Sequence, residues 1–284
     1  MKLNRLKTMS AVAIAAALLT LGASAAPAKE VDVTPSALDH WQVQNDGTST
    51  VTFVNGPANP PCGAGSAQFT VDSSGATASQ LRNTNYAGTL LSDLTQLSYS
   101  TFVTRNNGGQ AGNGGQAVYI ILNIDLNGDG IADDLLFFEP VYQSATFFPS
   151  NSQGPLALNT WQSWNALTGG WWSVNGIAGA NPGTGVKSLH DYIAAQPNAR
   201  IVNSATGFGG VRLVAGFGGP TDWGNFLGNA DCFRIATNGG SDITYDFEIG
   251  ADSCKNGGWQ SFDRADGTPF KNQGDCVQYE NTGK

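Results

Sequence analysis

Val118-Tyr-Ile-Ile-Leu-Asn-Ile124 and Leu135-Leu-Phe-Phe138 are two apolar runs separated by ten residues rich in Asp, Asn and Gly. Each run has the length and the β-branched and aromatic content of a buried strand. A connection this short favours antiparallel pairing of strands that are neighbours in the sheet. The stretch therefore predicts a hairpin in the core of a β-sheet protein.

Short apolar or alternating runs, separated by clusters of Gly, Asn, Pro and Asp, continue from about Val31 to Gly250. This punctuation is typical of an all-β sandwich. The candidate strands are Thr50 to Val54, Ala67 to Asp72, Leu97 to Thr104, Ala117 to Asp125, Leu135 to Tyr142, Trp161 to Ala166, Val211 to Phe217, Cys232 to Thr237 and Thr244 to Glu248.

One helix is expected from Val186 to about Gln196. Val186, Leu189 and Ile193 share a face at helical spacing, and Pro197 ends the run. We expect this helix to lie across the sandwich as a connector.

The N-terminus has the features of a secretion signal. Basic residues at 2, 5 and 7 precede an apolar stretch, and Ala23-Ser-Ala25 resembles a signal-peptidase site. A membrane anchor is the alternative, but the apolar stretch is shorter than the ~20 residues that cross a bilayer. We therefore expect residues 1–25 to be a signal peptide, 26–250 a β-sandwich domain and 251–284 a small C-terminal element.

The charge of the chain limits its partners. Its net charge is −8, and removal of the three cations in residues 1–25 changes this to −11. Such acidity disfavours nucleic acid and anionic lipid. No later segment is apolar enough to span a membrane, and the sequence leaves the oligomeric state open.

Four cysteines lie beyond the signal, which predicts two disulfides in an exported chain. Three pairings are possible. We favour Cys254 with Cys276, which would hold a C-terminal element too small for a core of its own, and Cys62 with Cys232, which would join an early strand to a late one.

The loop inside the central hairpin, Asp125-Leu-Asn-Gly-Asp-Gly-Ile-Ala-Asp133, has the spacing of a calcium loop. Its ligands would be the side chains of Asp125, Asn127 and Asp129, the carbonyl of Ile131, and Asp133 directly or through water. Calcium would then be a structural cofactor of the fold.

Position 12 of this loop is Leu136, where a glutamate would normally complete the calcium site. A site without it would be weak, with a dissociation constant on the order of 10⁻⁴ to 10⁻³ M. The alternative is a plain hairpin turn in which Asn-Gly and Asp-Gly supply positive φ.

Tryptophans in loops are candidates for stacking on sugar rings, with Asp and Asn binding hydroxyls. Trp223 lies in a turn-rich loop beside Asp222 and Asn225, and Trp171 and Trp172 must point to opposite faces of a strand. We expect ligand binding at Trp223, Trp172, Asp222 and Asn225, the alternative being that these indoles are buried under loops.

Catalytic residues are weakly indicated. A glycosidase needs two facing carboxyl groups, and Glu139 and Glu248 are the glutamates embedded in strand-like runs. Partners for arginine or backbone amides are the alternative role for both. The two histidines lie in no catalytic motif.

Several phrases resemble a group of secreted bacterial jelly-roll domains, largely of uncharacterised function, whose fold is similar to that of carbohydrate-binding modules. They are Leu81-Arg-Asn-Thr-Asn-Tyr86, Leu97-Ser-Tyr-Ser-Thr101, Asp133-Asp-Leu-Leu-Phe-Phe-Glu-Pro-Val-Tyr142, Leu213-Val-Ala-Gly-Phe217, Asn229-Ala-Asp231 and Tyr245-Asp-Phe-Glu248. The Cys254 to Val277 segment resembles a short C-terminal element of bacterial secreted proteins. The resemblance implies a jelly-roll-like antiparallel β-sandwich and specifies no activity.

These features favour a secreted, calcium-stabilised protein that binds a polysaccharide, a cell-surface glycan or another extracellular surface without catalysis. A polysaccharide hydrolase or lyase is one alternative, in which Glu139 and Glu248, or a pair such as Tyr142 and Arg212, would meet in one cleft. A structural or adhesive envelope protein is the other.

Overall fold

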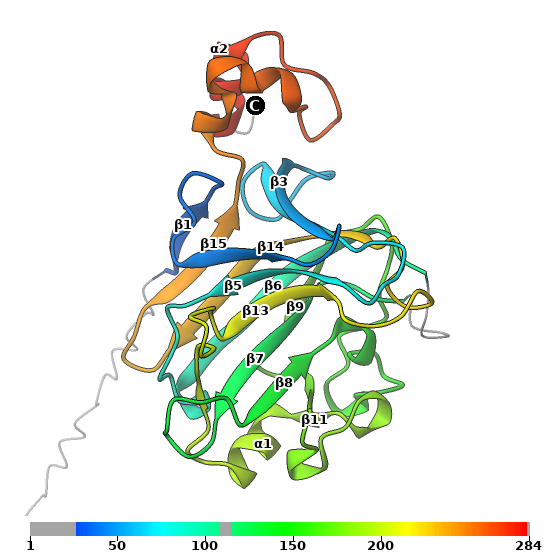
Figure 1. Cartoon of the computed structure of the whole chain (residues 1–284), viewed down its shortest axis with the longest axis vertical. Helices are drawn as coiled ribbons and strands as arrows, with labels where there is room; N and C mark the ends of the chain where they lie inside the picture. Colours follow the sequence, from blue (N-terminus) through cyan, green and yellow to red (C-terminus); the bar gives the residue numbers. More distant parts are fainter. Residues whose placement is uncertain (1–26, 108–114, 283–284) are drawn as a thin grey trace, which may run out of the picture.

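The computed structural model describes residues 27–107 and 115–282, so the expected signal peptide lies outside the described residues. Two β-sheets face each other, as the sequence predicts, and this confirms the all-β sandwich. Figure 1 shows α2 of the C-terminal element at one end of the sandwich and α1 at the other.

The first sheet has the order β1-β15-β14-β4-β3, and β6 also pairs with β14 and carries β9. Its strands are β1 Lys29–Val33, β3 Thr50–Asn55, β4 Gly65–Thr70, β6 Leu94–Arg105, β9 Gln162–Asn165, β14 Leu227–Thr237 and β15 Asp242–Phe247. The second sheet has the order β11-β10-β8-β7-β13-β5-β2, with β12 beside β7. Its strands are β2 Trp41–Asn45, β5 Ala78–Asn83, β7 Tyr119–Asp125, β8 Asp134–Phe138, β10 Gly170–Ser173, β11 Lys187–Ser188, β12 Arg200–Ile201 and β13 Val211–Gly216.

Two α-helices and six short 3-10 segments complete the described chain. The α-helices are α1 Leu189–Ala195 and α2 Gln273–Thr282. The 3-10 segments are η1 Leu91–Asp93, η2 Pro140–Tyr142, η3 Pro149–Asn151, η4 Ile177–Gly179, η5 Gly183–Gly185 and η6 Ala251–Ser261.

The central hairpin forms as expected. β7 and β8 pair antiparallel from Ile120 opposite Phe138 to Ile124 opposite Asp134. One departure from an antiparallel sandwich is β1, which pairs with β15 in parallel, from Lys29 opposite Ile243 to Val33 opposite Phe247.

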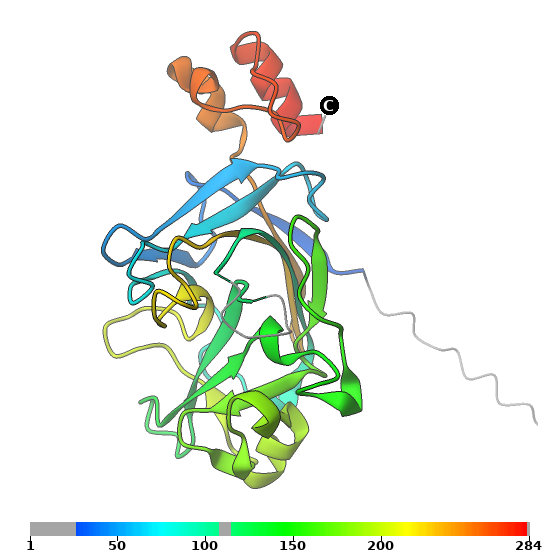
Figure 2. The same ribbon diagram turned by 90° about the vertical axis from the view of Figure 1, so that its right-hand side faces the viewer.

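The core lies between the two sheets. Trp41 of the second sheet packs edge-on against three aromatic rings of the first, at centroid distances of 5.4, 5.4 and 5.3 Å: Phe233, Tyr245 and Phe247. Such edge-to-face contacts add to the gain from burial itself. The view in Figure 2 is turned by 90° and shows the layers from the side.

The connector helix differs from its prediction. α1 begins at Leu189, because Ser188 caps it and forms a capping box with Asp191, so Val186 lies outside the helix. The Tyr192 hydroxyl donates to Asp134 Oδ2 at 2.7 Å, which holds α1 at the loop end of the β7–β8 hairpin. The helix therefore packs at this end of the sandwich and not across its face.

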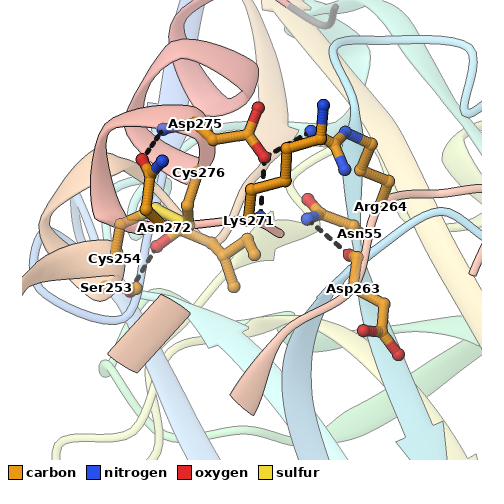
Figure 3. Close-up of a disulfide and its surroundings, with 10 residues drawn as sticks. Asn55, Ser253, Cys254, Asp263, Arg264, Lys271, Asn272, Asp275 and Cys276 are labelled. Carbon is orange, nitrogen blue, oxygen red and sulfur yellow. Dashed lines mark hydrogen bonds and ion pairs between the residues drawn. A yellow bond between two sulfur atoms is a disulfide. The ribbon is translucent and has the colours of Figure 1, made fainter. Parts of the chain in front are cut away.

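Both expected disulfides are present. Cys62 and Cys232 join with a Cα–Cα distance of 5.6 Å, and Cys254 and Cys276 with 5.8 Å. The second bond joins η6 to α2, the two helical segments of the C-terminal element (Figure 3). The two disulfides fit an oxidising or extracellular environment.

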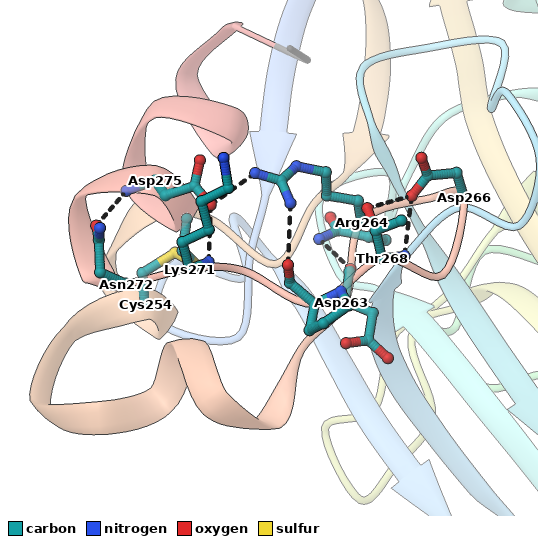
Figure 4. A network of polar contacts seen from close by, with 11 residues as sticks. Cys254, Asp263, Arg264, Asp266, Thr268, Lys271, Asn272 and Asp275 are labelled. Atoms are coloured by element: carbon teal, nitrogen blue, oxygen red, sulfur yellow. Dashed lines mark hydrogen bonds and ion pairs between the residues drawn. A yellow bond between two sulfur atoms is a disulfide. The ribbon is translucent and has the colours of Figure 1, made fainter.

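Polar contacts complete the C-terminal element. Asp275 accepts from the Arg264 guanidinium at 2.6 Å and from the Lys271 N–H at 2.8 Å, and Thr268 bonds to Asp266 (Figure 4). Its small apolar cluster includes Phe270 and Ala64, the latter from the sandwich. The element therefore shares its core with the domain on which it sits.

Among the described helices, none has both the length and the apolar character needed to cross a membrane.

Candidate functional site

An open cavity of about 370 Å³ lies on the outer face of the second sheet, and we call it the groove. Strands β7, β8, β10 and β13 form its floor, and the chain after β13 adds one wall. The lining residues are Tyr119, Ile121, Leu135, Phe137, Glu139, Trp172, Arg212, Gly216, Phe217 and Trp223.

Strand register explains why these side chains meet. Six directly opposed residues form one row across the sheet: Gln42, Arg82, Arg212, Ile121, Phe137 and Trp172. Directly opposed side chains on neighbouring strands project to the same face. The row changes from polar on β2, β5 and β13 to apolar on β7, β8 and β10.

The apolar half of the groove is an aromatic surface. Phe137 and Trp172 stack with centroids 4.0 Å apart and planes at 9°, and Tyr119 lies 6.2 Å from Phe137. Phe217 stands at the rim with 53% of its surface exposed. An exposed flat ring beside a partly apolar cavity suits the apolar face of a sugar.

The polar half of the row carries two guanidinium groups, of which that of Arg212 lines the groove. Arg212 donates through Nη2 to Asn123 Oδ1, and its buried Nε has no hydrogen-bond partner. Arg82, on the neighbouring strand, donates to Gly209 O and Gln44 Oε1, and its buried Nη2 is unpartnered. Among the described residues, neither arginine forms an ion pair with a carboxylate. The unpartnered nitrogen atoms are themselves buried, so what Arg212 offers a ligand in the groove is the positive charge of its guanidinium.

Burial sets the protonation of the groove. Burial, and then Arg82, lower the pKa of Arg212 to about 10, so Arg212 stays charged at neutral pH. Burial raises the pKa of Glu139 to about 7, and the negative charge of Asp222 raises it further. The hydrogen bond from Trp172 Nε1 to Glu139 Oε2, at 2.7 Å, acts in the opposite direction. Glu139 can therefore gain or lose a proton near neutral pH.

Of the four ligand-binding residues expected from sequence, the two tryptophans line the groove and the two polar residues do not. Trp172 and Trp223 both line the groove, although Trp223 is only 3% exposed and packs on Tyr119 and Phe226. Asp222 is partly exposed and close enough to raise the pKa of Glu139. Asn225 is exposed and does not line the groove, and its carbonyl accepts from Arg105.

Glu139 and Glu248 are not brought together. Glu139 follows β8 and lines the groove of the second sheet, whereas Glu248 follows β15 of the first sheet and lines a different cavity. Arg212 lines the groove with Tyr119, and Tyr142 is not among the lining residues.

The acidic loop closes on its own backbone. Asp125 accepts from the N–H groups of Asn127, Gly128 and Gly130 at 3.0, 2.6 and 3.0 Å. Three further side chains accept loop N–H groups: Asn127 from Asp129, Asp129 from Ile131, and Asp133 from Leu126. Leu136 is fully buried, so position 12 points into the core.

Burial acts to raise the pKa of Asp125, but those N–H groups and Arg200 outweigh it and leave the pKa lowered. Side chains of the loop therefore hold its backbone, while their remaining carboxylate oxygens stay available as calcium ligands.

Three aromatic groove residues were not expected from sequence: Tyr119, Phe137 and Phe217. The run from Val118 to Ile124 is almost entirely apolar, which hides its two-residue alternation. Placing Tyr119, Ile121 and Asn123 on the outer face requires the register with β8 and β13.

No protein-family model and no curated protein matches the chain. Among solved structures, the chain is similar to the N-terminal CBM22-1-CBM22-2 tandem domain of Xyn10C from Paenibacillus barcinonensis, at 14% identity and a TM-score of 0.32. The match covers 71% of this chain and 46% of that one, so the chain spans about half the length of that tandem domain.

Proposed function

We propose that this protein is secreted and binds a glycan in the groove without altering it. The observation that carries the proposal is the row across the second sheet, which sets the Arg212 guanidinium beside an aromatic surface in the same groove. Sugars need both, because their C–H faces stack on rings and their hydroxyl or carboxylate oxygens accept hydrogen bonds. The net charge of −8 argues against a polyanionic nucleic acid as the ligand.

Removing groove contacts should weaken glycan binding. We expect Trp172→Ala and Arg212→Met each to reduce affinity for a bound oligosaccharide by about 10-fold or more, because truncating an anchor residue of a binding site costs over 1 kcal/mol. Phe217→Ala should reduce it without destabilising the fold, since the ring is 53% exposed. The measurement is a glycan array of neutral and acidic polysaccharides, followed by calorimetry on the hits.

Leu158→Ala is the matched control for Phe217→Ala. Leu158 is 46% exposed and contacts the first sheet through its bridge with Val103, away from the groove. Binding should be unchanged in this variant. Equal affinities for wild type and all groove variants would rule out this site.

One observation favours a second candidate, a polysaccharide hydrolase or lyase. Glu139 lies in the groove beside Trp172 with a pKa raised to about 7 by burial, which suits a general acid or base. Release of reducing or unsaturated sugars that Glu139→Gln abolishes, with binding retained, would support catalysis. Binding without release across the same panel supports the non-catalytic role.

We also propose that the acidic loop binds calcium weakly as a structural ion. Millimolar calcium should raise the thermal midpoint, since an ion that binds only the folded state stabilises it. The Asp125→Ala, Asp129→Ala double variant should lose the part of this rise that requires millimolar concentrations, consistent with a dissociation constant on the order of 10⁻⁴ to 10⁻³ M. If calcium shifts the thermal midpoint equally in wild type and variant, the loop is a plain hairpin turn and binds no calcium.

A further inference from the structure

A second acidic site lies far from the loop, where the C-terminal element meets the sandwich. A cavity of about 230 Å³ there is lined by four acidic residues: Asp32 of β1, Asp246 of β15, Glu248, which follows β15, and Glu280 of α2. Asp32 and Asp246 are opposite each other in the parallel pair. No lysine or arginine is among the residues that line this cavity or the adjoining one, which shares Asp32, Glu248 and Glu280.

Two of these carboxylates are buried and incompletely bonded. Asp246 is 2% exposed and its Oδ1 has no hydrogen-bond partner; Glu248 is 8% exposed and its Oε2 has none. Glu248 Oε1 accepts from the Ala64 N–H at 2.6 Å. Burying charged oxygen atoms without partners is costly, and a bound cation would offset that cost.

The backbone beside the cavity is shaped around the acids. A Cβ atom on Gly63 would lie 1.7 Å from Glu248 Oε1 and 2.6 Å from Asp246 Oδ2. A Cβ atom on Gly65 would lie 2.6 Å from Glu248 Oε2. The Cys62–Cys232 disulfide anchors this loop to β14, where Asp231 accepts from the N–H groups of Cys62 and Phe247.

Charge repulsion is concentrated at one point. The carboxylate oxygens of Glu30, Asp32 and Asp246 lie within 4.8 Å of one another. Burial, followed by Asp231 and Glu248, raises the pKa of Asp246 to about 9, and burial raises that of Glu280 to about 7. A divalent cation would offset the repulsion between charges that lie this close together.

We propose that four carboxylates form a calcium site that fastens the C-terminal element to the sandwich: those of Asp32, Asp246, Glu248 and Glu280. Calcium suits a set of three or more carboxylate ligands from flexible positions, whereas magnesium retains most of its water. Glu280 is the member supplied by α2, so ion binding and docking of the element are coupled.

Elsewhere the element contacts the sandwich through Phe262, which packs against the main core, and through polar or small residues. Asn55 Nδ2 donates to Asp263 O at 2.9 Å (Figure 3), and Ala64 joins the small apolar cluster of the element. An ion bound between β1, β15 and α2 would therefore be a major fastening of this element.

Calorimetric titration of calcium into metal-free protein tests the site. Wild type should show a site of higher affinity than the acidic loop, and Glu280→Gln should weaken it by about 10-fold through loss of one carboxylate. Asp246→Asn, Glu248→Gln should abolish it. Asp46→Asn is the matched control, since this exposed aspartate lies outside both the cavity and the acidic loop, and it should leave the site intact.

Hydrogen exchange of the amides of α2 gives an independent readout. Calcium should slow exchange across Gln273–Thr282 in wild type but not in Glu280→Gln. Because Glu280 is partly exposed near the end of α2, this substitution should leave the fold intact. Unchanged calcium affinity in the cavity variants would overturn the proposal. So would equal binding of magnesium, or α2 exchange that ignores calcium in wild type.

Discussion

Replacing Cys62 and Cys232 together by Ala should lower the free energy of unfolding of the sandwich by about 4 to 5 kcal/mol. This disulfide spans 170 residues, and the entropy that a cross-link removes from the unfolded chain grows with the length of the closed loop. For a domain of this size the thermal midpoint should fall by roughly 10 to 20 °C. Urea unfolding followed by tryptophan fluorescence measures the change.

The other disulfide supplies the control. Cys254 and Cys276 are separated by 22 residues, so their replacement should cost about 3 kcal/mol at most. That cost should fall mainly on the C-terminal element, because the disulfide joins η6 to α2 and both cysteines lie in the element's own apolar cluster. A sandwich midpoint lowered as much by the second replacement as by the first would contradict this division.

Metal-free protein should become less stable as the pH rises from 5 to 9, by on the order of 3 kcal/mol. Burial raises the pKa of Asp246 to about 9 and those of Asp231 and Glu280 to about 7, well above their values in an unfolded chain. Between pH 5 and 9 the folded state therefore holds protons that the unfolded state has released. Stability must fall as the pH passes through these folded pKa values.

Calcium should flatten this profile, because the bound ion neutralises the carboxylates that repel one another at high pH. Asp246→Asn, Glu248→Gln should flatten it too, and should be more stable than wild type at pH 8 in metal-free buffer. Chemical unfolding across the pH range tests both. A profile that rises with pH in the metal-free wild type would show that these groups are not destabilising when charged.

Local pattern predicted much of the sandwich. The hairpin around the acidic loop, both disulfides and each of the nine strands expected from apolar runs have counterparts in the structure. Among the strands that were missed, β5 lacks an apolar signal: it reads Ala-Ser-Gln-Leu-Arg-Asn, yet all six of its residues are buried. Its burial results from neighbouring strands and loops that cover both faces, which sequence alone does not reveal.

The groove and the acidic cavity depend on register and on long-range contacts. Arg212 and Phe137 are 75 positions apart in the chain and are brought into one row by β7, which lies between their strands. In the sequence, Glu248 looks like an ordinary acidic residue at the end of a strand. Only the structure shows that β1, the loop after Cys62 and α2 surround it. Trp172 and Trp223 were predicted from local sequence: Trp172 belongs to a Trp-Trp pair, and Trp223 lies in a turn-rich loop beside Asp222 and Asn225.

The parallel pairing of β1 with β15 also constrains the order of assembly. Strand β1 is synthesised first among the described strands, and its partner, Asp242–Phe247, follows more than 200 residues later. Contacts between residues so far apart in sequence form slowly, because the entropy of closing a long loop is lost before the contacts can stabilise the chain. Strand β1 therefore stays without its partner until nearly the whole polypeptide has been synthesised. In a chain that is exported unfolded and folds after crossing a membrane, this late pairing would delay folding little.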